Sequence, residues 1–185
     1  MNITLHLILA HFLADYPLQS NWLAKYKAKS PLGILLHSLT HFAISALLAL
    51  PFICSGKLWW GVTIIFVTHY ISDEVKVNLQ KKTGWHPFWL YSIDQIIHLI
   101  IIYGVSAFYL DKMATCFSGA WATYYGDYTM VSFLLILTLV TYFYDITRWT
   151  LLGAPKKEPY KRDYPMMARN ALIVVIAFIV YWMTK

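Results

Sequence analysis

The segment HYISD, residues 69–73, lies near the end of the third hydrophobic run of the chain. Residues four apart on a helix lie one above the other, so the His69 imidazole and the Asp73 carboxylate point the same way. The same step occurs three more times, in His11 with Asp15, His37 with His41, and Asp94 with His98. Scattering these residue types at random gives about one such spacing rather than four. The four pairs therefore predict several helices that converge on one polar site.

The composition is that of an integral membrane protein. Of the 185 residues, 59% are hydrophobic and 13% are charged, and the mean hydropathy is +0.53. A soluble domain carries about 25% charged residues, so this chain has too few charges for that class. The net charge of +6 does not indicate nucleic-acid binding, because the basic residues lie between apolar runs, as in membrane proteins. We expect membrane lipids as partners and no nucleic acid.

Six hydrophobic segments are expected, at about 3–15, 31–54, 58–77, 87–110, 130–152 and 170–183. The first is shorter than the roughly 20 residues that cross a bilayer core, so it must be tilted, partly re-entrant or shielded by its neighbours. The predicted fold class is an all-α, polytopic membrane helix bundle with one integral-membrane domain over 1–185. Residues 1–110 form a site-bearing four-helix part, and 111–185 add two further helices and a basic loop.

The direction of the segments decides where the pairs lie. If successive segments alternate in direction, all four pairs fall toward the same end of the bundle, and 12 of the 15 Lys and Arg residues do too. The positive-inside rule makes that end cytoplasmic, with both termini outside. Cys54 and Cys116 then lie toward the outer face, where a disulfide is allowed and two free thiols are equally compatible. With no CxxC motif, a thiolate metal site is excluded.

The chemistry of the pairs favours a metal centre. An ionisable group at membrane depth costs about 2.5 kcal/mol or more, so it needs a partner. Neutral imidazoles and carboxylates bind zinc, iron and manganese. The predicted metal ligands, for one or two divalent ions with zinc as the first choice, are His11, Asp15, His37, His41, His69, Asp73, Asp94 and His98. A metal-free proton relay and structural hydrogen bonding are the alternatives. His6 and His86 fall outside the pattern.

A few polar residues flank the predicted site. Lys76 follows the HYISD segment on the same helical face and could receive a phosphate or carboxylate group, although a membrane-surface lysine is equally compatible. Gln19 and Gln95 are placed to orient a ligand or a water molecule. Asp145 and Arg148 are three residues apart and are expected to form an ion pair, with a contact to substrate as the alternative.

Several motifs resemble those of a known family. They are HFLADYPLQSNWLAKYKAKS at 11–30, the two histidines that follow, HYISDEVK at 69–76 and DQIIH at 94–98. Together they are similar to a family of small bacterial membrane proteins, the domain of unknown function 3307, over about residues 5–110. This resemblance implies a multi-pass protein of the bacterial cytoplasmic (inner) membrane, and the family name implies no activity. A looser similarity is to membrane-bound metal-dependent hydrolases.

The function that these features predict is a membrane-embedded, metal-dependent hydrolase acting on a lipid or other amphiphile, at a phosphoester or an acyl ester. The metal would activate water and polarise the ester oxygen, with Asp73 or Asp94 as general base and Lys76 beside them. A diiron oxidase or hydroxylase is a variant of the same site. The alternatives are a divalent-metal or proton transporter, and a membrane sensor or partner protein with a structural metal.

Overall fold

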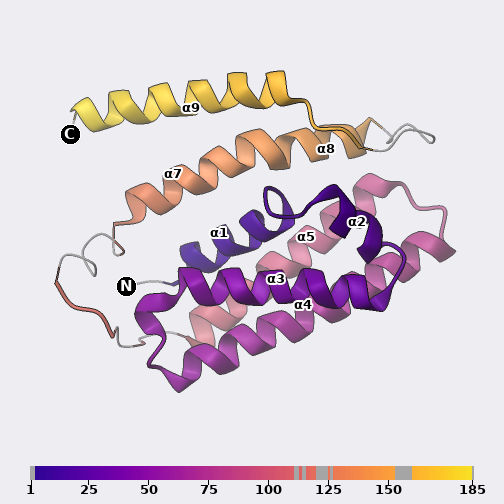
Figure 1. Cartoon of the computed structure of the whole chain (residues 1–185), viewed down its shortest axis with the longest axis horizontal. Helices are drawn as coiled ribbons and strands as arrows, with labels where there is room; N and C mark the ends of the chain where they lie inside the picture. The colour runs from indigo at the N-terminus through magenta and orange to yellow at the C-terminus, as the bar shows by residue number, and fades with distance from the viewer. Residues whose placement is uncertain are drawn as a thin grey trace.

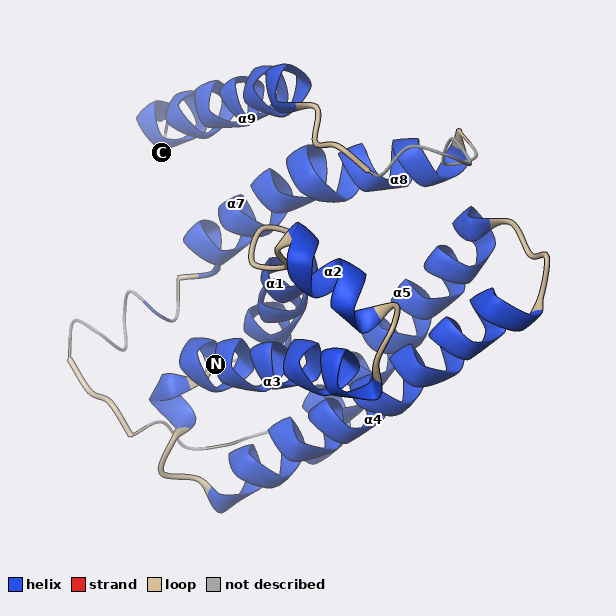
Figure 2. Ribbon diagram, turned by 45° about the vertical axis from the view of Figure 1, so that its right-hand side comes forward, coloured by secondary structure: helices blue, strands red, loops and turns tan. Residues whose placement is uncertain are grey.

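A computed structural model describes residues 3–110, 113, 116–119, 125, 127–152 and 160–184. All regular structure within these residues is helical, and Figures 1 and 2 show a bundle of helices. The elements are α1 (Thr4–Asp15), α2 (Asn21–Lys27), α3 (Pro31–Leu48), the 3-10 turn η1 (Leu50–Phe52), α4 (Gly56–Lys82), α5 (Pro87–Gly104), the π-helical turns η2 (Val105–Tyr109) and η3 (Leu139–Phe143), α7 (Tyr128–Thr138), α8 (Tyr144–Leu151) and α9 (Tyr164–Thr184).

The all-α bundle and its membrane character are confirmed. Four helical stretches in the described residues are long and apolar enough to cross a membrane: Pro31–Leu48, Pro87–Tyr109, Tyr128–Leu151 and Tyr164–Thr184. α4 is long enough as well, with 27 residues, although its last turns are charged. α1, with 12 residues, is the short segment.

Local chemistry explains where the helices start and stop. Ser30 and His86 cap α3 and α5, because the side chain of each accepts a hydrogen bond from the backbone N–H two residues later. Each is followed by a proline in the first helical turn, where the missing N–H costs nothing. α1 ends ahead of Pro17, which has no backbone N–H to continue the hydrogen bonds of the helix.

The short helix α1 lies at the centre of the bundle, packed against α3, α5 and α7 (Figure 1). Its length is about 18 Å at 1.5 Å per residue, against a hydrocarbon core about 30 Å thick. Its buried residues are His6, Leu7, Leu9, Ala10, His11, Phe12 and Ala14. Shielding by neighbouring helices, one of the three arrangements that the sequence left open, is therefore observed.

The two ends of the bundle differ in chemistry. At the end where α1 begins and α9 ends, a Cys54–Cys116 disulfide joins the segment after η1 to the loop after α5. The core of this disulfide end is apolar and consists of Ile3, Leu7, Ala49, Phe52, Leu58, Val62, Ile65, Ile102 and Leu110. The opposite, basic end contains the corner between α1 and α2 and the lysines at the end of α4. Of the two states that the sequence allows for Cys54 and Cys116, a disulfide or two free thiols, the structure contains the disulfide.

Gly33 allows α2 to pack closely on α3. A Cβ at this position would lie 2.4 Å from the carbonyl carbon of Tyr26 and 2.6 Å from the amide nitrogen of Lys27. Because these are backbone atoms, Gly33→Ala is expected to push α2 away from α3 and to destabilise the fold by about 1–3 kcal/mol. The measurement is the midpoint of thermal unfolding in detergent. Gly104→Ala is the control, since its Cβ would meet nothing within 4 Å. Equal midpoints for the two variants would contradict the close packing.

Candidate metal centre

The structure brings all eight predicted ligands into one buried cluster between α1, α3, α4 and α5. They form three overlapping groups, and within each group the potential ligand atoms lie within 4.8 Å of one another. The groups are Asp15 with His37, His41 and His69; His11 with His69 and His98; and Asp73 with Asp94 and His98. The Asp15 side chain is 9% exposed, and the other seven residues are classed as buried. The convergence is as the spacing predicts, and the role of these residues as metal ligands stays a prediction.

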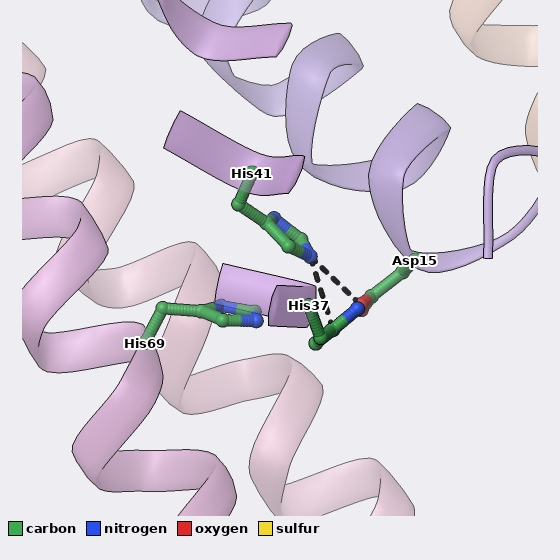
Figure 3. Close-up of side chains that lie close together, drawn as sticks. All are labelled: Asp15, His37, His41 and His69. Atoms are coloured by element: carbon green, nitrogen blue, oxygen red, sulfur yellow. Dashed lines mark hydrogen bonds and ion pairs between the residues drawn. The ribbon is translucent and has the colours of Figure 1, made fainter. Parts of the chain in front are cut away.

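The first group has the spacing of a coordination site (Figure 3). Asp15 Oδ1 lies 3.0 Å from His41 Nε2 and 3.1 Å from His37 Nε2, and the two nitrogens are 3.2 Å apart. Zinc–nitrogen bonds of about 2.0–2.1 Å place tetrahedral ligands roughly 3.3 Å apart. Three ligand atoms therefore already lie close to the spacing of one face of a zinc tetrahedron. The ring of His69 lies 3.8 Å from that of His41 between centroids.

The remaining ligands have buried polar atoms without hydrogen-bond partners. Within the described residues these atoms are Nδ1 of His11, Nε2 of His69, both ring nitrogens of His98, and Oδ1 of both Asp73 and Asp94. Of these, Nε2 of His69 lies 3.3 Å from Asp73 Oδ2 in an ion-pair contact. The His69 and His98 rings stack with centroids 4.1 Å apart. An unsatisfied buried polar group costs about 1–3 kcal/mol. Several in one cluster fit a site whose lone pairs a cation would satisfy.

Two lysines form ion pairs with two of the carboxylates. Lys76 Nζ lies 2.6 Å from Asp94 Oδ2, and Lys27 Nζ lies 2.6 Å from Asp73 Oδ2. The sequence predicts Lys76 beside the site, whereas it gives no signal for the contact of Lys27. No helical spacing links Lys27 to a pair, because it reaches the cluster only through the packing of α2 on α3.

Both predicted glutamines contact the cluster. Gln95 Nε2 donates a 2.9 Å hydrogen bond to Asp15 Oδ2, and Gln95 Oε1 accepts one of 3.0 Å from the Tyr16 hydroxyl. Gln19 Nε2 lies 3.1 Å from His37 Nδ1. Such contacts fix the orientation of a ligating imidazole or carboxylate. The prediction that these residues flank the site is confirmed.

The predicted ion pair between Asp145 and Arg148 is wrong. Asp145 instead accepts a hydrogen bond from the hydroxyl of Tyr160, and Arg148 Nη1 lies 3.6 Å from a carboxylate oxygen of Asp163. The cause is that the segment before α9 folds back over α8 and supplies closer partners than the helix itself. His6 belongs to none of the three ligand groups, as expected.

The pairs in α3, α4 and α5 lie closer to the middle of their helices than the sequence suggested, whereas the pair His11 and Asp15 lies at the end of α1. His37 and His41 are the seventh and eleventh of the 18 residues of α3. At 1.5 Å per residue they lie roughly 9 and 15 Å from the start of that helix. The cluster is therefore well below the basic end, and its assignment to the cytoplasmic side stays a prediction.

Two openings reach the cluster. A groove of about 350 Å³ runs between α4 and α5, with apolar walls and with Lys76 and Asp94 among its lining residues. A cavity of about 50 Å³ lies at the basic end and has Asp15 in its wall. Asp94 is thus reached from the apolar groove, and Asp15 is reached from the polar cavity.

Comparison with known proteins identifies the family. The family model described as "Protein of unknown function (DUF3307)" matches residues 3–125, which contain α1 to α5 and all eight clustered residues. No curated protein and no solved structure matches the chain. The matched region covers more than half of the chain, and the protein therefore belongs to the DUF3307 family.

Proposed function

We propose that this protein is a membrane-embedded hydrolase that uses a divalent metal ion to cleave a phosphoester or acyl ester of a lipid or other amphiphile. The observation that carries the proposal is the convergence of five imidazoles and three carboxylates from four helices. Ionisable groups buried at membrane depth mark functional sites. The description of the family contains no activity, so the proposal depends on this site alone.

The charges of the cluster favour one resident ion. Three carboxylates and the two lysines that pair with them give a net charge of −1 when the imidazoles are neutral. One divalent ion would bring the net charge to +1, whereas two would bring it to +3, a large charge to bury in a low-dielectric site. We assign the resident ion to the Asp15 group, with zinc as the first choice and iron or manganese as alternatives. A second ion at Asp73, Asp94 and His98 would need an anionic ligand.

The side chains have distinct roles in the proposed reaction. The bound ion would lower the pKa of a water molecule and polarise the ester. Asp94 and Asp73 each direct one oxygen without a hydrogen-bond partner into the cluster, and either could accept a proton from water. Lys76 forms an ion pair with Asp94 and would position that carboxylate. The groove between α4 and α5 offers an apolar surface for the hydrocarbon part of the substrate.

The orientation in the inner membrane is part of the proposal. The excess of lysine and arginine at the basic end favours the cytoplasm for that end. The disulfide at the other end favours an oxidising compartment there. With that orientation, α1 begins and α9 ends on the outer side, as expected from the sequence.

A transporter for divalent metal ions or protons is the second candidate, because the cluster lies near the middle of α3 and transport sites lie near the bilayer midplane. The apolar core of the disulfide end opposes it, since a transported ion would have to cross that layer. A purely structural metal, as in a sensor or partner protein, would have closed coordination. The two openings at Asp15 and Asp94 argue against that arrangement.

Hydrolysis of lipid esters by the purified protein tests the proposal. Zinc-loaded protein in detergent is incubated with phosphoesters and acyl esters of lipids, and released phosphate and fatty acid are measured. We expect a chelator to abolish release and Asp94→Asn to lower the rate about 100-fold or more, the loss typical of a general base. Glu74→Gln, on the same helix but outside the three ligand groups, is the control. Zinc uptake into liposomes without ester cleavage would assign the site to transport instead.

A further inference from the structure

The small cavity at the basic end is built from two distant parts of the chain. Gln19 and Asn21 come from the corner between α1 and α2, and Tyr142 and Arg162 come from η3 and the segment before α9. Asp15 forms part of the wall and connects the cavity to the metal-ligand cluster. The family match ends at residue 125, so the C-terminal half of this cavity lies outside it.

Arg162 is held rigidly in the cavity wall. Its Nη2 donates hydrogen bonds of 3.0 Å to the carbonyl oxygen of Tyr16 and 3.2 Å to that of Gln19, and its guanidinium lies 5.2 Å from the centre of the Tyr142 ring. A guanidinium carries five N–H groups, and these bonds account for the two on Nη2. In the part of the chain that the structure describes, no acceptor contacts the N–H groups on Nε and Nη1. A fixed cation with donors to spare therefore lines a cavity beside Asp15.

Apart from Asp15, the other polar groups of the cavity are neutral. The Tyr160 hydroxyl donates to Asp145, and burial together with that carboxylate raises the pKa of Tyr160 well above its usual range. Asn21 is exposed at the start of α2. Asp15 supplies the one negative charge among the described lining residues, and a metal ion in its group would offset it. The loaded site would thus attract an anion.

We propose that this cavity binds the phosphate group of a phosphate ester. Of the two ester classes in the proposed function, this binding selects the phosphoester, and the reaction itself rests on that proposed function. The guanidinium fork matches phosphate oxygens in geometry and charge. A volume of about 50 Å³ suits a group of a few heavy atoms and is too small for an acyl chain, since one water molecule needs about 10–15 Å³ of such cavity volume. In the reaction, the water oxygen would bond to phosphorus, the ester P–O bond would break, and a proton would pass to the departing alkoxide.

Titration of inorganic phosphate into the full-length protein in detergent, with zinc added or removed, tests the site by calorimetry. We expect zinc-dependent binding that Arg162→Gln weakens about tenfold to hundredfold, the effect of losing charge-assisted hydrogen bonds. Arg169→Gln removes the same charge from an exposed position on α9 and should leave the affinity unchanged. Asn21→Asp places a negative charge in the cavity and leaves the contacts of Arg162 intact. A loss of phosphate affinity in this variant therefore reports on binding and not on folding.

Each outcome decides one question. Loss of affinity in both Arg162→Gln and Asn21→Asp supports the phosphate site, and wild-type affinity in both overturns it. Zinc content, measured in the same samples, reports on the metal centre separately. Equal phosphate affinity with zinc removed would keep the cavity as a phosphate site and contradict its expected dependence on the metal. Repeating the titration with phosphatidic acid, against phosphatidylcholine, distinguishes a lipid head group from free phosphate as the preferred occupant.

Discussion

Replacing His41 and His69 together by alanine is expected to reduce bound zinc from about one ion per chain to roughly a tenth or less. The two imidazoles belong to the Asp15 group, and a four-ligand zinc site that loses two ligands cannot complete its tetrahedron. The measurement is elemental analysis of detergent-purified protein after dialysis. Circular dichroism of the same samples checks that the helices are retained.

His86→Ala is the matched control for this experiment. His86 is exposed at the start of α5 and belongs to none of the described ligand groups. We expect this variant to keep its zinc. A double variant that retains as much zinc as the control would refute the site at the Asp15 group.

Lys27→Met is expected to destabilise the protein by about 3–5 kcal/mol, because it leaves the Asp73 carboxylate buried without its closest counter-charge. Asp73 is fully buried, and the Lys27 side chain is only 12% exposed, so solvent cannot replace the lost partner. For a chain of this size the loss corresponds to a fall of roughly 10 °C or more in the unfolding midpoint. Thermal unfolding in detergent, with zinc removed from all samples, provides the measurement.

Two further variants test the cause of that loss. Lys29→Met removes an exposed lysine two residues away and should change the midpoint little. Combining Lys27→Met with Asp73→Asn removes both charges and should recover part of the stability. If Lys27→Met unfolds at the same temperature as Lys29→Met, the contact between Lys27 and Asp73 does not contribute to the fold.

The sequence predicts the parts of this structure that depend on helical spacing. The pair His69 and Asp73 needs only the four-residue step to face one way, and alternation of apolar segments is enough to bring four such pairs to one depth. Caps are local as well, so the start of α3 at Pro31 follows from the sequence. For these features, neighbours along the chain supply the physical cause.

Features that depend on contacts between distant segments were not predictable. Lys27 meets Asp73 because Gly33 lets one helix backbone approach another. Arg162 reaches the end of α1 because the segment before α9 folds back over α8. Neither contact leaves a periodic pattern in the sequence. The packing of α1 among α3, α5 and α7 is likewise a property of the assembled bundle.

The apolar layer at the disulfide end has a consequence for membrane energetics. With the proposed orientation it lies between the polar cluster and the outer compartment, and among the described residues it opposes a continuous proton path through the eight clustered side chains. A protein with five imidazoles in its core can thereby reside in an energised membrane without acting as an uncoupler. Any acid released at the cluster would return to the compartment from which the water came, and the electrochemical gradient would not be dissipated.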